Sequence, residues 1–335
     1  MSKESSNESL SPLGERKIIS LIHSIIGDSL NSLLPFNDDA VAIEIGDKVL
    51  VINTDMFVRK TDAPQGMTVR QIGQKVIVMN ISDLAAKGAT PVGFLSALGF
   101  PSDYSKNDIE ELLHGFKEAC SLYRTPYLGG DTNEADDLVI TGIALGITNK
   151  DELISRAGAQ EGDLVCVTGM FGKTAAGFKI LLENLECPEH LRNEFIDAVF
   201  YPQARLNEGL ALAKSRTPTA SIDSSDGLAW SLHEIASASN IGIEINKLPI
   251  DLSVEEFARL NRLDPFDLCF YGGEEFELIV IIPPEKIVHA SAALNVVKGQ
   301  LIPIGRIVKT EGLFYTEGGK KRVIYPRGYE HFTKH

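Results

Sequence analysis

The sequence has few cysteines, few basic residues and no long apolar run, and each shortage excludes a class of protein. Its four cysteines form no Cys-x-x-Cys pair, which argues against a zinc site or a disulfide framework and favours a reducing compartment. The 46 acidic residues outnumber the 32 basic ones, and the formal net charge is −14. An acidic chain without basic stretches is a poor partner for nucleic acid or an anionic membrane. No apolar stretch reaches a membrane span of roughly 18 residues, so we expect a cytoplasmic protein.

Motifs for nucleophilic and zinc-dependent catalysis are missing as well. The seven histidines are dispersed without a His-Glu-x-x-His motif, and Gly-x-Ser-x-Gly does not occur. Residues 168–174 resemble a P-loop, but Val167 stands where the first glycine is required. We interpret this segment as a tight strand-to-helix turn whose backbone amides can still face a ligand.

A chain of 335 residues is long enough for two domains. We expect a tail at residues 1–14, which are rich in Ser, Glu and Asn and have no signal-peptide core, an N-terminal domain at 15–150 and a C-terminal domain at 151–335. Periodicity in the N-terminal part predicts helices at 15–26, 68–87 and 106–123 and strands at 41–45, 49–53, 92–98 and 138–148. This is a ββαβαβ order, an α+β arrangement. The C-terminal part alternates strand and helix signals and is predicted to be an α/β domain.

What the chain does contain is a set of aspartates at the ends of apolar runs. The members are Asp39, Asp55, Asp83, Asp131, Asp223 and Asp226. Carboxylates that converge after folding repel one another unless a cation lies between them. Oxygen ligands without soft partners suit Mg²⁺, which commonly binds a few carboxylates together with substrate phosphates. The pattern therefore predicts a Mg²⁺–polyphosphate site.

Asp83 is the most informative of the six. On a helix it shares one face with Ile72, Val76 and Met79. A carboxylate on an apolar stripe is costly unless it is paired or bound to metal. A structural ion pair explains Asp83 alone equally well, but the other aspartates favour metal.

Each remaining motif also has an ordinary explanation. Asp39 in a pair of acids fits a solvated loop, Gly129-Gly130 before Asp131 fits a simple turn, and Asn53-Thr54-Asp55 ends a predicted strand. Ser225 or Asp226 can be a helix N-cap, although acids at both 223 and 226 exceed what capping needs. Gly272-Gly273-Glu274 is either the entry to a hairpin or a substrate-binding loop.

Taken in order, these phrases resemble those of the thiamine-monophosphate kinases, a family within the aminoimidazole-ribonucleotide-synthetase-like ATP-binding superfamily. The resemblance extends over residues 14–332. It rests on Asp38-Asp39-Ala40-Val41, Thr54-Asp55-Met56, Asn80-Ile81-Ser82-Asp83-Leu84-Ala85-Ala86, Gly129-Gly130-Asp131-Thr132, Ser155-Arg156-Ala157-Gly158, Asp223-Ser224-Ser225-Asp226-Gly227-Leu228, Gly272-Gly273-Glu274-Glu275-Phe276-Glu277-Leu278 and Gly328-Tyr329-Glu330-His331-Phe332. Eight phrases in the right order make the resemblance specific.

The resemblance implies a homodimer in which the N-terminal sheet pairs with that of the partner. It also implies transfer of the γ-phosphoryl group of ATP to thiamine monophosphate, with several Mg²⁺ ions. By position, the implied metal ligands are Asp39, Thr54, Asp55, Asp83, Asp131, Asp223 and Asp226. The implied ATP contacts are Gly130, Asp131, Arg156 and Ser225, and Glu274 and Tyr329 lie on the acceptor side.

One segment departs from the family pattern. Bacterial members usually follow the Thr-Asp motif with a short run that ends in His-Phe, whose histidine contacts substrate. Residues 58–64 are Val-Arg-Lys-Thr-Asp-Ala-Pro here, so we expect Asp62 to take the place of that histidine.

The implied chemistry agrees with the missing catalytic histidine. Phosphoryl transfer between anions needs charge neutralisation and alignment more than a covalent catalyst. The alternatives are an enzyme like aminoimidazole ribonucleotide synthetase or selenophosphate synthetase, a metal-dependent phosphohydrolase, and a nucleotide-binding regulator without turnover. The first cysteine, Cys120, comes too late for the reactive residue of a selenophosphate synthetase, and a regulator would not need so many carboxylates.

Overall fold

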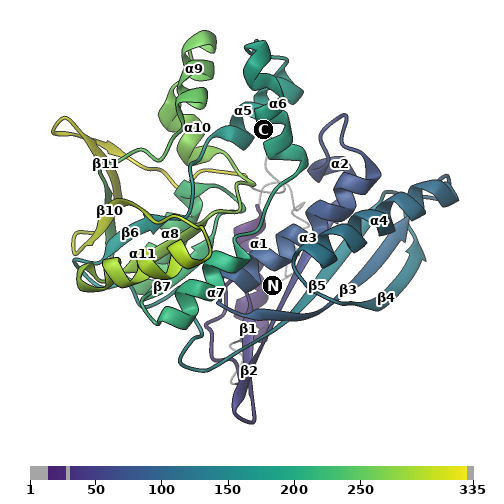
Figure 1. Ribbon diagram of the computed structural model, residues 1–335, viewed down its shortest axis with the longest axis horizontal. Coiled ribbons are helices and arrows are strands. Elements are labelled where there is room, and N and C mark those ends of the chain that lie inside the picture. Colours follow the sequence, from purple (N-terminus) through teal and green to yellow (C-terminus); the bar gives the residue numbers. More distant parts are fainter. Residues whose placement is uncertain (1–13, 28–30, 330–335) are drawn as a thin grey trace, which may run out of the picture.

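The computed structural model describes residues 14–27 and 31–329. Two α+β domains, each built on its own sheet, lie side by side (Figure 1). The predicted tail at 1–14 lies outside the described residues except for Gly14. Within the described part of the chain, no helix is long and apolar enough to cross a bilayer.

The N-terminal domain is a five-stranded sheet with two long helices on one face (Figure 1). Its elements are α1 (Glu15–Ile26), β1 (Val41–Ile45), β2 (Lys48–Val58), α2 (Arg59–Asp62), α3 (Val69–Ala86), β3 (Thr90–Phe100), α4 (Lys106–Leu122), β4 (Tyr127–Glu134) and β5 (Val139–Thr148). The strand order is β1-β2-β5-β3-β4, in which β4 runs parallel to β3 and every other pair is antiparallel.

Two parts of this sheet differ from the prediction. The predicted ββαβαβ order did not include β4. This exposed edge strand has glycines and short polar residues, which have little intrinsic β-propensity. Strand β2 also continues past Asp55 to Val58, because its pairing with β5 extends over the whole length of both strands. Asp55 therefore lies inside a strand and not at its end.

Helix α3 is the central element of the molecule. It begins at a reciprocal capping box between Thr68 and Gln71, where the predicted helix at 68–87 starts. One side packs on β2, β3 and β5, and the other meets α7 (Leu206–Ser215) and β7 (Ala220–Asp223) of the second domain. Because α3 contacts both sheets, its side chains reach the boundary between the domains.

The opposite face of the N-terminal sheet carries apolar side chains. Alternate residues of β5 point away from α3, and the same face of β1 and β2 exposes large hydrophobic groups. Exposed members are Val41, Ile43, Met56 and Ile147. A face of this kind is typical of an interaction surface.

The C-terminal domain is a seven-stranded sheet in the order β12-β11-β8-β10-β6-β9-β7. Besides α7 and β7, its elements are β6 (Leu164–Val167), α5 (Lys173–Glu183), α6 (Glu189–Phe200), α8 (Leu228–Ser239), β8 (Gly242–Ile245), α9 (Leu252–Asn261), α10 (Pro265–Tyr271), β9 (Leu278–Ile282), the 3₁₀ helix η1 (Pro284–Lys286), α11 (Ile287–Val296), β10 (Ile302–Val308), β11 (Leu313–Glu317) and β12 (Lys320–Val323). The α/β prediction was wrong in strand direction, since among the strands of this sheet in the described residues only β8 and β11 pair in parallel. The order of helices and strands along a chain does not fix which strands become neighbours.

Candidate metal and phosphate site

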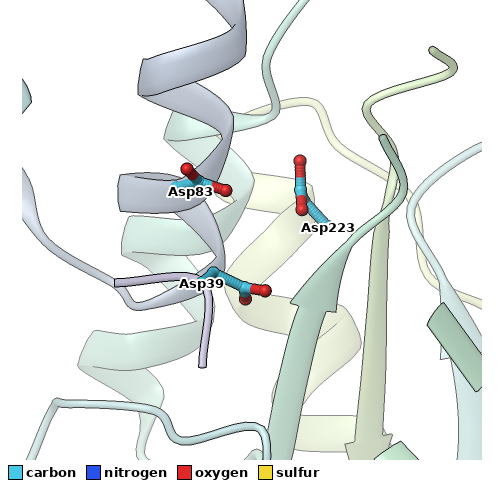
Figure 2. Close-up of side chains that lie close together, drawn as sticks. All are labelled: Asp39, Asp83 and Asp223. Atoms are coloured by element: carbon cyan, nitrogen blue, oxygen red, sulfur yellow. The ribbon is translucent and has the colours of Figure 1, made fainter. Parts of the chain in front are cut away.

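Three of the predicted aspartates meet at the boundary between the two domains. Asp39 comes from the loop before β1, Asp83 from α3, and Asp223 from the end of β7 (Figure 2). One carboxylate oxygen from each lies within 4.8 Å of the others. Both domains therefore contribute to one group of acids.

Two of these carboxyl groups resist ionisation. Burial, followed by the charges of Asp55 and Asp223, raises the pKa of Asp83 well above its ordinary value. Burial, and then the charge of Asp39, raises the pKa of Asp223 to about 8. Their hydrogen bonds come from neutral groups: Asn53 Nδ2 donates to Asp83 Oδ2 at 2.7 Å, and Ser82 Oγ donates to Asp223 Oδ2 at 2.6 Å. These oxygens fit a divalent cation of the Mg²⁺ type, because its charge would offset both the burial and the repulsion that raise the two pKa values.

Asp39 is different because two cations hold it in the ionised form. Lys87 Nζ lies 2.9 Å from Asp39 Oδ2, and Arg156 donates to Oδ1. Burial opposes ionisation, but the two cations outweigh it and lower the pKa of Asp39. Lys87 also binds Asp38 at 2.5 Å and donates to the Ser221 carbonyl at 3.0 Å. This network fixes the loop of Asp39 to α3 and β7.

Asp55 and Asp226 add to the same field. Asp55 shares the inner face of β2 with Asn53, and burial, followed by Asp226 and Asp39, raises its pKa to about 6. Asp226 lies in the loop between β7 and α8, and Arg16 of α1 binds its Oδ2 at 3.1 Å. Five of the six aspartates thus interact around one place.

Thr54 and Asp131 are not part of this group. The Thr54 side chain projects from the opposite face of β2, and its hydroxyl donates to the Gly142 carbonyl at 2.9 Å. Asp131 is exposed on the edge strand β4. Its neighbour Gly130 allows β4 to approach β3, since a Cβ there would lie 1.7 Å from the Ser96 carbonyl oxygen.

The other predicted nucleotide contacts lie beside the acids. Arg156 connects Asp39 to Glu234 of α8, whose Oε2 accepts from Nη1 at 3.0 Å. Ser225 is exposed in the turn between β7 and α8. Its carbonyl accepts the Glu274 amide at 2.6 Å, so this turn joins the metal-side and acceptor-side residues.

The predicted acceptor-side residues gather around Lys75, a buried residue of α3. Lys75 Nζ lies 2.6 Å from Glu274 Oε1 and donates to the Asp62 carbonyl at 2.8 Å. Tyr329 donates its amide to the Asp226 carbonyl at 3.2 Å. Burial, followed by Asp62 and Glu274, raises the pKa of the Tyr329 phenol to about 12, which places these groups near one another.

Comparison with known proteins agrees with this arrangement. The model of the AIR synthase related protein N-terminal domain matches residues 37–148, and that of the C-terminal domain matches 160–316. The thiamine-monophosphate kinase of Pyrococcus abyssi is 36% identical over 88% of this chain and 90% of its own. That of Nitrosopumilus maritimus is 32% identical over 96% of this chain and 100% of its own.

The chain belongs to the thiamine-monophosphate kinase family. A solved structure described as AaThiL complexed with AMPPCP and TMP is 29% identical, has a TM-score of 0.85, and covers 98% of this chain and 100% of its own.

Two buried lysines that pair with acids of the site were not identified from the sequence. Lys75 on α3 and Lys87, the residue that caps the end of α3, are both fully buried, and each pairs with an acid that the motifs did identify. A signal was present, because Lys75 precedes the apolar run at residues 76–79 and Lys87 follows Leu84-Ala85-Ala86. A buried lysine needs an anionic partner, but the sequence does not show which one.

The segment that resembles a P-loop has another role. The amides of Gly172 and Thr174, at the start of α5, donate to Glu275 Oε1 at 2.6 and 3.2 Å. Burial raises the pKa of this carboxyl group to about 7. A cavity of about 600 Å³ adjoins it, lined in part by Lys173 and Arg205. Because Glu275 takes the anion-binding amides, this turn does not present them to a phosphate.

Proposed function

We propose that this protein transfers the γ-phosphoryl group of ATP to thiamine monophosphate, producing thiamine diphosphate and ADP. The observation that carries the proposal is the convergence of Asp39, Asp83 and Asp223 in a chain of this family. A similar chain was solved with AMPPCP and TMP, a nucleotide analogue and a monophosphate. These are the two classes of ligand that such a site requires.

Mg²⁺ is the cation that suits the donor set, which consists of oxygens without sulfur or imidazole. We assign Asp39, Asp55, Asp83, Asp223 and Asp226 to hold several ions. Thr54 and Asp131, which the family motifs also suggested, are not part of this group and are not assigned to it. When bound, Mg²⁺ would neutralise the phosphates of ATP and of the acceptor.

The protein's own groups position the substrates. Arg156 carries a charge that Asp39 and Glu234 fix in direction, so it is suited to a nucleotide phosphate. Gly130 leaves backbone exposed on β4, and Ser225 presents a hydroxyl at the start of α8. The acceptor phosphate, with a second pKa of about 6, is already ionised near neutral pH. The reaction therefore needs no strong general base.

The acceptor side is assigned to Asp62, Glu274 and Tyr329. The thiazolium ring of thiamine is a cation, which a carboxylate and an aromatic face both attract. Glu274 is half-buried and Tyr329 is 36% exposed, so both can meet a ligand. Asp62 holds the short helix α2 in place through the Val58 amide, which donates to its Oδ2 at 2.7 Å.

We further propose that the protein works as a homodimer, joined through the uncovered face of the N-terminal sheet. The exposed apolar groups of β1, β2 and β5 match the self-complementary patch of a two-fold interface. The four cysteines are all free, which agrees with a reaction in the cytoplasm.

The deciding experiment is incubation of the purified protein with ATP, Mg²⁺ and thiamine monophosphate, followed by chromatography of the thiamine species. We expect thiamine diphosphate and ADP in equal amounts, and no product in the presence of a chelator. ADP and phosphate without thiamine diphosphate would identify a phosphohydrolase instead. ATP binding without turnover would identify a regulator.

A further inference from the structure

Lys75 occupies an unusual position for a lysine. Its side chain is 1% exposed, although the ammonium group lies at the acceptor end of the site. Its two hydrogen bonds go to the Asp62 carbonyl and to Glu274 Oε1, and the Phe57 ring lies 5.8 Å away. Burial of an ammonium group is costly, so its position indicates a purpose beyond packing.

Its partner Glu274 is held in a strained conformation. The backbone φ of Glu274 is 66°, in the left-handed region that side chains other than glycine seldom adopt. Such strain is unfavourable and is concentrated at functional sites. The Glu274 amide binds the Ser225 carbonyl at 2.6 Å, and this contact ties the strained residue to the turn after β7.

The two oxygens of the Glu274 carboxylate differ in their hydrogen bonding. Lys75 takes Oε1, whereas Oε2 is buried and has no hydrogen-bond partner among the described residues. An unsatisfied carboxylate oxygen is unfavourable unless a ligand completes it. The geometry leaves one oxygen available to a donor or a cation.

Direct contact between Lys75 and a substrate phosphate does not suit this arrangement. The ammonium group is enclosed, and two of its three donors are already used within the protein. Lys75 therefore acts on substrate through Glu274.

We propose that Lys75 is a positioning residue that fixes the rotamer of Glu274, so that Oε2 faces the cationic part of the acceptor. Lys75 would thereby contribute to selectivity for a phosphate ester that also carries a positive ring. This inference rests on the proposed function and deepens it.

A double-mutant cycle tests the inference, using full-length Lys75→Met, Glu274→Gln and the double variant. In each protein we would measure kcat, KM for thiamine monophosphate and for ATP, and the melting temperature. Lys75→Met should raise the KM for thiamine monophosphate roughly tenfold, with the KM for ATP changed by less than about twofold. The double variant should match Glu274→Gln, because Lys75 has nothing to position once that carboxylate is gone.

The double variant also guards against misfolding. Lys75→Met alone leaves an ionised Glu274 without its partner, whereas the double variant removes both charges and should keep a melting temperature near that of the wild type. If Lys75→Met does not fold but the double variant does, and the KM values of the double variant equal those of Glu274→Gln, the inference stands.

Two outcomes would overturn it. The KM for thiamine monophosphate in the double variant could instead rise by the product of the two single-variant factors. Lys75 would then act independently of Glu274, as a direct phosphate ligand would. An unchanged KM for thiamine monophosphate in Lys75→Met, or an equal rise for ATP, would leave Lys75 a structural residue. If the wild type forms thiamine diphosphate and the variants give either of these results, this inference alone is refuted. If the wild type forms no thiamine diphosphate, the proposed function is refuted and this inference with it.

Discussion

The electrostatic environment of Asp83 indicates the function of this residue. Burial and the charges of Asp55, Asp223 and Asp39 all raise its pKa, and the hydrogen bond from Asn53 offsets only part of the effect. A carboxylate kept only for stability would be expected to have a cation beside it, as Asp39 has Lys87. The surroundings of Asp83 favour the metal interpretation that its position on an apolar helix face first suggested.

Asp83→Asn should abolish turnover without unfolding the protein. The amide removes a charge from a repelling group, so the melting temperature without metal should be unchanged or higher. Activity should fall by at least about 100-fold, because a metal ligand is lost. Thermal melts beside an activity assay check this. A loss of about 3–5 kcal/mol of stability would instead identify half of a structural ion pair.

Asp223 makes the stability of the metal-free protein depend on pH. Its pKa is about 8 in the folded protein against an ordinary value of 3.8, so between these values the folded state binds more protons than the unfolded state. The free energy of unfolding then decreases as pH rises from about 4 to about 8. Asp55, with a pKa of about 6, acts in the same direction.

Melts in chelator across this range should therefore show a falling melting temperature. Asp223→Asn should show a smaller fall, and the difference between the two proteins cancels groups common to both, such as His233. Saturating Mg²⁺ should remove the fall in the wild type, because the metal binds the ionised carboxylates. Parallel curves for wild type and variant would show that Asp223 titrates normally.

Among the elements, α3 could be predicted from the sequence and β4 could not. The start of α3 follows from Thr68 and Gln71, and its end from Gly88, all local signals. Strand β4 has no such signal, since its glycines and polar residues are typical of a turn. It becomes a strand only because β3 offers a free edge, and that edge is a property of the folded sheet.

The pair Gly129 and Gly130 tests this account of β4. A Cβ on Gly130 would meet the Ser96 carbonyl at 1.7 Å, whereas one on Gly129 would meet nothing within 4 Å. Gly129 has a φ of 126°, so Gly129→Ala serves as a control for backbone strain alone. We expect Gly130→Ala to lose about 2 kcal/mol more stability than Gly129→Ala, measured by denaturant unfolding. Equal losses would mean that strain and not the close approach requires Gly130.

At the scale of the whole molecule, the site depends on the contact between the domains. Sequence motifs identified most of its acids, but not which of them meet. Asp83 and Asp223 are 140 positions apart, and the packing of α3 against β7 brings them together. Lys75 could not be assigned for the same reason, because it pairs with Glu274 of the other domain.

The uncovered face of the N-terminal sheet is the proposed contact of the homodimer, and a substitution on it tests that proposal. Leu145 lies in the central strand β5 and points to that face, beside Ile52 of β2. An aspartate there would place a charge in the proposed interface, and its desolvation would oppose association. Leu145→Asp should therefore convert the dimer of 36.5 kDa chains into a monomer in light scattering. Leu252→Asp is the matched control, since Leu252 is 81% exposed on α9 of the other domain and should leave the dimer intact. A monomeric wild type, or a dimeric Leu145→Asp variant, would exclude this face as the contact.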